Sequence, residues 1–207
     1  MIPGFKYFPE YLNKDEQKSL LEKLRNKIQQ NPLFEPQMPS TGKPFSVKMT
    51  NFGSLGWVSD KNQGYRYQAT HPSTKSPWLP IPDILLKLWN DLADYPEEPE
   101  CCLLNYYHNE KSKMGLHRDE DEEDQIAPVF SLSLGDTAMF KIGGLTRKGP
   151  SNFIKLASGD VVILGGKARK AYHGVDRILH GSSQLLKHGG RINLTMRRVT
   201  PPKIHTL

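Results

Sequence analysis

Two stretches in the first hundred residues repeat apolar positions at the spacing of a helix. The first follows Asn13, which forms a capping-box pattern with Glu16, and its apolar stripe consists of Leu20, Leu21, Leu24 and Ile28. The second is predicted to start near Pro82 and to end at Tyr95-Pro96, with apolar positions at Ile84, Leu85, Leu88, Trp89 and Leu92. The residues between them, 32–80, are rich in proline and glycine. We therefore expect residues 1–100 to be helical and irregular.

From Cys101 onward the pattern changes to short alternating or wholly apolar runs, separated by turns that contain glycine. The predicted strands are Cys101–Tyr107, Pro128–Leu134, Ala138–Ile142, Asn152–Leu156, Asp160–Leu164 and Arg191–Arg198. Many short strands at this spacing are typical of a sandwich or a jelly roll. We expect an α+β protein with a mainly β core, in which residues 1–100 are an N-terminal extension of the core at 101–207, the two forming one compact unit.

The last predicted strand alternates strictly between polar and apolar residues. Its polar face carries two guanidinium groups, an amide and a hydroxyl, from Arg191, Asn193, Thr195 and Arg197. If this face looked into a barrel, the two arginines would need anions, and a dicarboxylate ligand would supply one for each. The alternative is a solvated outer face that binds phosphate or nothing.

Two histidines and a carboxylate are candidates for a metal site. His117 and Asp119 are two residues apart, so in an extended segment both side chains point to the same side. A second histidine, His173, follows the apolar run at 160–164. Two histidines and one carboxylate form the facial triad of non-haem Fe(II) oxygenases, which leaves metal positions open for substrate and dioxygen. The alternative is a surface histidine beside an acidic loop.

Composition and charge narrow the possible partners. Hydrophobic residues make up 37% of the chain, and no apolar run approaches the ~20 residues that span a bilayer, so we expect no membrane partner. The net charge is +6, and residues 125–207 hold 13 Lys and Arg against 3 Asp and Glu. This basic half indicates either a polyanionic partner, such as nucleic acid, or a solvated face without a partner. Six acids in a row occupy 119–124, and the part from Glu120 to Asp124, apart from Asp121, is interpreted as a solvated loop at the mouth of the pocket.

Two further features bear on the compartment. Cys101 and Cys102 are adjacent, which suits neither an ordinary disulfide nor a CxxC metal site, so we interpret both as reduced thiols. The N-terminal residues lack the basic start and apolar core of a secretory signal. Both observations favour the cytoplasm.

Several motifs, taken in order, closely resemble the AlkB family of Fe(II)- and 2-oxoglutarate-dependent dioxygenases, which repair alkylated nucleobases. The motifs of the core are Asn105-x-Tyr107, Leu116-His117-x-Asp119, Ser131-x-Ser133-Leu134-Gly135, Gly159-Asp160-Val161-Val162, Tyr172-His173-Gly174 and Arg191-x-Asn193-Leu194-Thr195-x-Arg197. Upstream, Met49-Thr50-Asn51, Leu55-Gly56-Trp57 and Gly64-Tyr65-x-Tyr67 are similar to the nucleotide-recognition lid of the bacterial members. The resemblance implies a double-stranded β-helix, or jelly roll, with N-terminal helices and such a lid.

The resemblance also assigns roles to individual residues. The implied iron ligands are His117, Asp119 and His173. The implied contacts of 2-oxoglutarate are Arg191 with Asn105 and Tyr107 for the distal carboxylate, and Arg197 with Asn193 near the carboxylate that chelates iron. On the substrate side, Trp57 is expected to stack on the damaged base opposite the His117 ring, Tyr65 to contact a backbone phosphate, Asp121 to contact the base edge and Arg147 to supply a cation.

The implied reaction is oxidative demethylation of bases of the 1-methyladenine or 3-methylcytosine type in DNA or RNA. It needs Fe(II), 2-oxoglutarate and dioxygen and releases formaldehyde, succinate and carbon dioxide. We expect a monomer that acts on single-stranded DNA or on a base flipped out of a duplex. Two departures from the family put substrate preference in doubt: the gap from Asn105 to His117 is one residue longer, and Leu164 stands where a tryptophan is expected.

Two other hypotheses remain open on the sequence. One is a nucleic-acid-binding module on a jelly-roll scaffold, without chemistry, which explains the basic half but not the two arginines on the polar face of the last strand. The other keeps the oxygenase chemistry but directs it at RNA or at a protein side chain.

Overall fold

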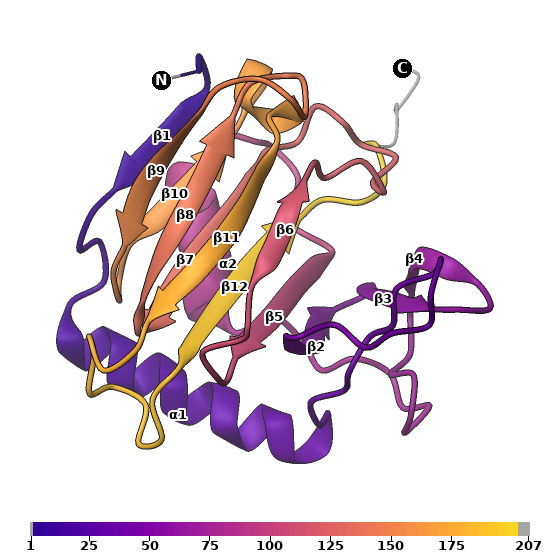
Figure 1. The fold of residues 1–207 in the computed structure, drawn as a ribbon. Helices are drawn as coiled ribbons and strands as arrows, with labels where there is room; N and C mark the ends of the chain where they lie inside the picture. Colours follow the sequence, from indigo (N-terminus) through magenta and orange to yellow (C-terminus); the bar gives the residue numbers. More distant parts are fainter. Residues whose placement is uncertain (1, 203–207) are drawn as a thin grey trace.

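Two facing β-sheets form the body of the protein in the computed structural model, which describes residues 2–202 (Figure 1). The larger sheet has the spatial order β1 (Phe5–Phe8), β10 (Val161–Leu164), β7 (Val129–Gly135), β12 (Arg191–Arg197), β5 (Cys101–Tyr107) and β2 (Lys48–Gly53). The smaller sheet has the order β6 (Met114–His117), β11 (His173–Leu179), β8 (Thr137–Gly143) and β9 (Ser151–Leu156). The expected mainly β jelly-roll architecture is confirmed.

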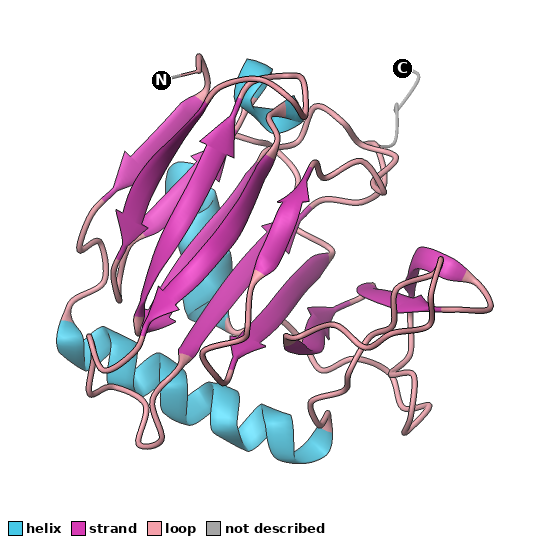
Figure 2. Cartoon of the chain, viewed as in Figure 1, coloured by secondary structure: helices cyan, strands magenta, loops and turns pink. Residues whose placement is uncertain are grey.

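Helices cover the outer face of the larger sheet (Figure 2). Helix α1 (Lys14–Gln30) begins with the predicted capping box, since the Asn13 side chain accepts from two backbone N–H groups and Glu16 accepts from the N–H of Asn13. Helix α2 (Asp83–Leu92) begins directly after Pro82, and a short 3₁₀ helix, η1 (Gly166–Lys170), precedes β11. Apolar residues of α1 and α2 pack in one cluster with the apolar face of β12.

Strand β12 lies in the larger sheet with antiparallel neighbours on both sides. Its register places Arg191 opposite Tyr107 of β5 and Gly135 of β7, and Asn193 opposite Asn105 and Ser133. Because its apolar face packs on the helices, its polar face points into the space between the sheets. The alternation in the sequence therefore places the two guanidinium groups inside the fold and not on a solvated outer face.

The first hundred residues contain more β structure than we expected. Strands β1 and β2 are part of the larger sheet, while β3 (Gly56–Asp60) and β4 (Gly64–Gln68) form a separate antiparallel hairpin that projects beyond the sheets, called here the lid hairpin (Figure 1). The sequence conceals β2 because Thr50 and Asn51 are polar but fully buried, so no alternation is visible. Strands β6 and β11 were also not predicted, since β6 has only four residues and β11 interrupts its apolar positions with exposed charges.

Between residues 2 and 202, no helix has the length and apolarity needed to cross a membrane.

Candidate active site

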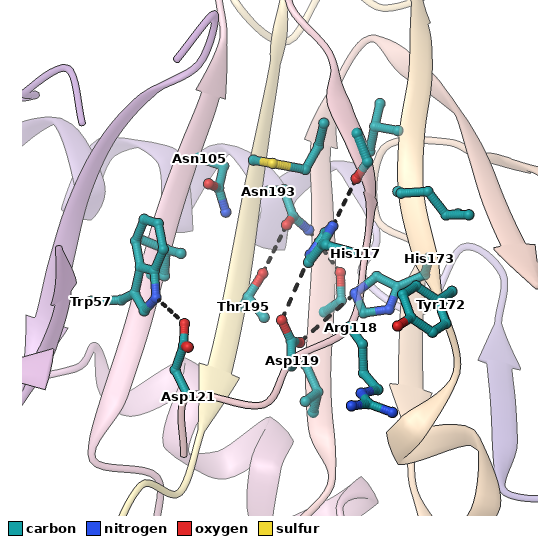
Figure 3. A pocket seen from close by; sticks show the side chains of 18 of the residues that line it. Trp57, Asn105, His117, Arg118, Asp119, Asp121, Tyr172, His173, Asn193 and Thr195 are labelled. Carbon is teal, nitrogen blue, oxygen red and sulfur yellow. Dashed lines mark hydrogen bonds and ion pairs between the residues drawn. The ribbon is translucent and has the colours of Figure 1, made fainter. Parts of the chain in front are cut away.

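The two candidate histidines are brought together by strand pairing. His117 ends β6 and His173 begins β11, and these strands pair antiparallel with the two residues in register. Their ring centroids lie 4.5 Å apart. Asp119 follows in the loop after β6, with Oδ1 3.6 Å from His117 Nε2 and Oδ2 3.8 Å from His173 Nε2. One ligand atom from each of the three side chains lies within 4.8 Å of the other two, and Figure 3 shows the groups pointing toward one another.

Backbone carbonyls fix the orientation of both rings. Nδ1 of His117 lies 2.9 Å from the carbonyl oxygen of Gly115, and Nδ1 of His173 lies 3.0 Å from that of Ala171. Each ring therefore donates its Nδ1 proton to a carbonyl, which leaves the Nε2 lone pair facing Asp119. This is the tautomer and the direction that a metal ligand requires.

The charge state of the group also suits a divalent cation. Burial lowers the pKa of His173 to about 4, with a further contribution from nearby His117, so the imidazole is neutral at physiological pH. Burial alone would raise the pKa of Asp119, but Arg197 and the two histidines outweigh it and hold that pKa below its usual range. Asp119 Oδ2 is buried without a hydrogen-bond partner. Two imidazole nitrogens and a carboxylate with a free oxygen fit Fe(II).

Arg191 is a buried cation that has no counterion within residues 2–202. The residue is 1% exposed, its Nη2 donates to Ser133 Oγ at 2.9 Å, and its Nε and Nη1 have no partner. Among residues 2–202, no carboxylate lies within 4 Å of its guanidinium group, and burial lowers the pKa of Arg191. The group stacks over the Tyr107 ring at 5.2 Å, and Asn105 Oδ1 is also buried and unpartnered. A carboxylate ligand would accept hydrogen bonds from the unpartnered Nε and Nη1 of Arg191.

Arg197, at the other end of β12, lies beside the metal ligands. Its Nη2 is 3.1 Å from Asp119 Oδ1, and its Nη1 is buried without a partner. Asn193, between the two arginines, uses its amide within the protein: Nδ2 donates to Ser131 Oγ at 2.7 Å, and Oδ1 accepts from Thr195 at 2.8 Å. The unpartnered guanidinium atoms at the two ends of the strand fit the two carboxylates of 2-oxoglutarate, while Asn193 is fixed by the sheet.

A single cavity of about 510 Å³ joins these groups. Every residue that the sequence assigned to iron, 2-oxoglutarate or substrate lines it: Trp57, Tyr65, Asn105, Tyr107, His117, Asp119, Asp121, Arg147, His173, Arg191, Asn193 and Arg197. Leu164, which replaces the expected tryptophan, is buried and also lines this cavity. The roles of the individual side chains stay predictions, but the structure places all of them around one space.

The lid hairpin supplies the aromatic side of the cavity. Trp57 stacks on Tyr65 with ring centroids 5.5 Å apart and an interplanar angle of 24°. The indole Nε1 donates to Asp121 Oδ2 at 2.8 Å, as Figure 3 shows, and Phe45 meets the indole edge-on. The predicted base-stacking residue and the predicted base-edge acid are thus hydrogen-bonded to each other.

Asn51 fixes the backbone of Trp57 and was not singled out by the sequence. It is fully buried on β2, where its Nδ2 donates to the Trp57 carbonyl and its Oδ1 accepts from the Trp57 N–H, each at 3.0 Å. The side-chain amide thus replaces the neighbouring strand that Trp57 lacks on this side. Only its place in the Met49-Thr50-Asn51 motif hinted at a role.

We predict that Asn51→Leu raises the KM for substrate about tenfold with little change in kcat, because two buried hydrogen bonds, each of about 1 kcal/mol, no longer hold Trp57. Thr50→Val is the matched control, since Thr50 is equally buried on β2 and loses one hydrogen bond to the Asn31 carbonyl without touching Trp57. Steady-state kinetics of both variants would test this. Equal KM values for the two variants would contradict it.

The interpretation of the acidic run as a solvated loop is wrong for part of it. Glu122 and Asp124 are 5% and 3% exposed. Glu122 forms a buried ion pair with Arg169 of η1 at 2.8 Å, and Asp124 caps the backbone N–H groups of Ile126 and Ala127. The sequence could not reveal the burial of Glu122, because its partner Arg169 lies 47 residues away and a run of acids has no apolar periodicity.

Comparisons with known proteins agree with this geometry. The family model described as the 2OG-Fe(II) oxygenase superfamily matches residues 4–197. An alpha-ketoglutarate-dependent dioxygenase AlkB homolog of Caulobacter vibrioides is 51% identical over 198 residues, which cover 96% of this chain and 89% of that protein. The alpha-ketoglutarate-dependent dioxygenase AlkB of Escherichia coli is 38% identical, covering 86% and 83%.

The fold agrees as well. The solved structure of OsALKBH1 superposes with a TM-score of 0.82 at 29% sequence identity, covering 96% of this chain and 98% of that one. The sequence matches extend over the strands that carry the triad and over β12, and therefore include the groups that fit iron and 2-oxoglutarate. The chain thus belongs to the AlkB family of Fe(II)- and 2-oxoglutarate-dependent dioxygenases.

Proposed function

We propose that this dioxygenase oxidatively demethylates alkylated bases of the 1-methyladenine or 3-methylcytosine type in DNA. The observation that carries the proposal is the continuity of the cavity, which is lined at once by the triad and by Trp57 of the lid hairpin. A flat ring lying against the indole would have its substituents within the same space as the metal ligands. The AlkB names of the relatives support the same reaction class.

The metal site and the two arginines of β12 have different roles in the reaction. Iron, with 2-oxoglutarate and dioxygen, supplies the oxidising chemistry that hydroxylates an N-methyl group, after which formaldehyde leaves. His117, Asp119 and His173 are the side chains that would hold the iron. Arg191 and Arg197 orient the two carboxylates of 2-oxoglutarate from opposite ends of β12.

Apolar side chains limit access of water to this space. Val129, Phe140 and Leu164 are buried and line the same cavity. Low water content strengthens the ion pairs of the bound carboxylates and keeps the oxidising chemistry directed at the substrate.

A base reaches the cavity only from a single strand or by flipping out of a duplex, and methylation on the pairing edge lowers the cost of flipping. Stacking on an aromatic side chain contributes about 1–3 kcal/mol per base. Tyr65 is half exposed beside Trp57, and Arg147 lines the same cavity, so both are available to the phosphate backbone. The excess of basic residues in 125–207 favours the approach of a polyanion.

The test is product formation from defined oligonucleotides. With Fe(II), 2-oxoglutarate and air, single-stranded DNA containing 1-methyladenine should yield succinate and formaldehyde in equal amounts, and unmethylated DNA should yield no formaldehyde. Methylated RNA and a methylated peptide are run in parallel. Turnover of only the RNA or only the peptide would reassign the substrate class. Binding of the oligonucleotide without formation of succinate would instead identify the protein as a nucleic-acid-binding module.

We further propose that the protein works as a monomer in the cytoplasm. Its two cysteines are free and fully buried, which suits a reducing compartment.

A further inference from the structure

The loop of residues 119–124, called here the acidic loop, contacts both the lid hairpin and the residues that fit iron and 2-oxoglutarate. Its first residue, Asp119, is a metal ligand, and its third, Asp121, accepts a hydrogen bond from Trp57 of the lid hairpin. Its fourth, Glu122, is buried between Tyr67 of β4, Arg169 of η1 and Arg197 of β12. None of the assigned roles explains this buried carboxylate.

One oxygen of Glu122 is held rigidly. Oε2 pairs with Arg169 Nη2 at 2.8 Å, and Arg169 is only 2% exposed. The rest of the Arg169 guanidinium group is also engaged, since Nε donates to the Ala127 carbonyl at 2.9 Å and Nη1 to the Asp119 carbonyl at 2.7 Å. Because three nitrogens of Arg169 are held by partners in the protein, the Arg169 guanidinium group fixes the position of the Glu122 carboxylate.

The other oxygen of Glu122 is shared between the lid hairpin and β12. Oε1 accepts a hydrogen bond from the Tyr67 hydroxyl and lies 3.3 Å from Arg197 Nε. That contact lacks the alignment of a hydrogen bond, so Arg197 Nε counts as unpartnered. A hydrogen bond from the lid hairpin and an ion pair from β12 therefore meet on a single oxygen atom.

We propose that Glu122 is a positioning residue that couples the lid hairpin to Arg197, so that 2-oxoglutarate and the alkylated base bind cooperatively. A carboxylate bound at Arg197 takes up part of its positive charge and weakens its attraction for Glu122 Oε1. That oxygen then accepts more strongly from Tyr67, which draws the lid hairpin toward the acidic loop. Because binding free energies are linked, a base held by the lid hairpin tightens 2-oxoglutarate by the same factor.

The proposal rests on the proposed function only in using a methylated oligonucleotide as the ligand of the lid. The experiment measures its affinity by fluorescence anisotropy, with Mn(II) in place of iron and with oxygen excluded, in the presence and absence of 2-oxoglutarate. In the unmodified protein, 2-oxoglutarate should tighten oligonucleotide binding about fivefold, within the usual range of coupling between two sites.

Tyr67→Phe should reduce this ratio to about one, because only the hydroxyl that links the lid hairpin to Glu122 is lost. Tyr95→Phe is the matched control. Tyr95 also donates its hydroxyl to an acid of the same loop, Asp124, but the carboxylates that pair with Arg197 are Asp119 and Glu122, and the Tyr95 variant should keep the full ratio. Glu122→Gln keeps the size of the side chain. In this variant too, 2-oxoglutarate should no longer tighten oligonucleotide binding.

Each outcome decides one of the two proposals. A ratio that persists in Tyr67→Phe, or that is already one in the unmodified protein, overturns the coupling and leaves the proposed function standing. Loss of the ratio in Tyr95→Phe as well would show a general loosening of the acidic loop and would also overturn it. Failure of the unmodified protein to bind the methylated oligonucleotide with or without 2-oxoglutarate would reject the proposed function itself.

Discussion

His173→Ala is expected to lower succinate formation by more than about 100-fold, because loss of a group that merely supports a metal ligand already costs 10- to 100-fold and this variant removes a ligand outright. His117 and Asp119 would remain, but two donors on one side of the ion do not hold it in place. Succinate is measured for both the unmodified protein and the variant at the same excess of Fe(II) and 2-oxoglutarate.

His180→Ala serves as the control for this experiment. His180 follows the same strand β11 at its far end, where its Nδ1 lies 3.8 Å from Asp136 and the side chain is 35% exposed. It should keep normal turnover. Full activity in His173→Ala, or an equal loss in both variants, would be incompatible with the triad as assigned.

Arg191→Met is expected to raise the KM for 2-oxoglutarate about 100-fold, because a charge-assisted hydrogen bond contributes about 1.5–3 kcal/mol and the variant removes the group that would form such bonds. The same variant should not lose stability in the absence of cofactor. Its charge is buried without a counterion, and methionine fills a similar volume without that desolvation cost.

Kinetics and thermal unfolding of the cofactor-free protein measure these two effects separately. Arg177→Met is the control, since Arg177 is an exposed residue of β11 that pairs with Asp176. It should change neither quantity. An Arg191→Met protein that unfolds at a much lower temperature, with an unchanged KM for 2-oxoglutarate, would assign Arg191 a purely structural role.

The sequence predicted the core of the fold because the periodic signal was strong there. The bounds of β5 were predicted without error, and the alternation of β12 correctly separated the face that packs on the helices from the face that carries Arg191 and Arg197. The sequence also proposed His117, Asp119 and His173 as metal ligands, and the structure brings one ligand atom of each within 4.8 Å of the other two. Their role as iron ligands stays a prediction.

Other features depend on long-range contacts that leave no local pattern. Asn51 is fully buried because its amide pairs with the backbone of Trp57, whereas a polar residue in a short strand indicates exposure when read alone. Glu122 is buried because Arg169 lies opposite, across 47 residues of sequence. These side chains do not touch the reacting atoms, and their function is to position the groups that do.

The most direct test of the metal site is an equilibrium titration of the metal-free protein with Fe(II) under exclusion of oxygen, in the presence of 2-oxoglutarate. We predict one tightly bound Fe(II) per chain in the unmodified protein and loss of that binding in Asp119→Ala. Fe(II) binding that is equally tight and of the same stoichiometry in the Asp119→Ala protein would contradict the assignment of the site.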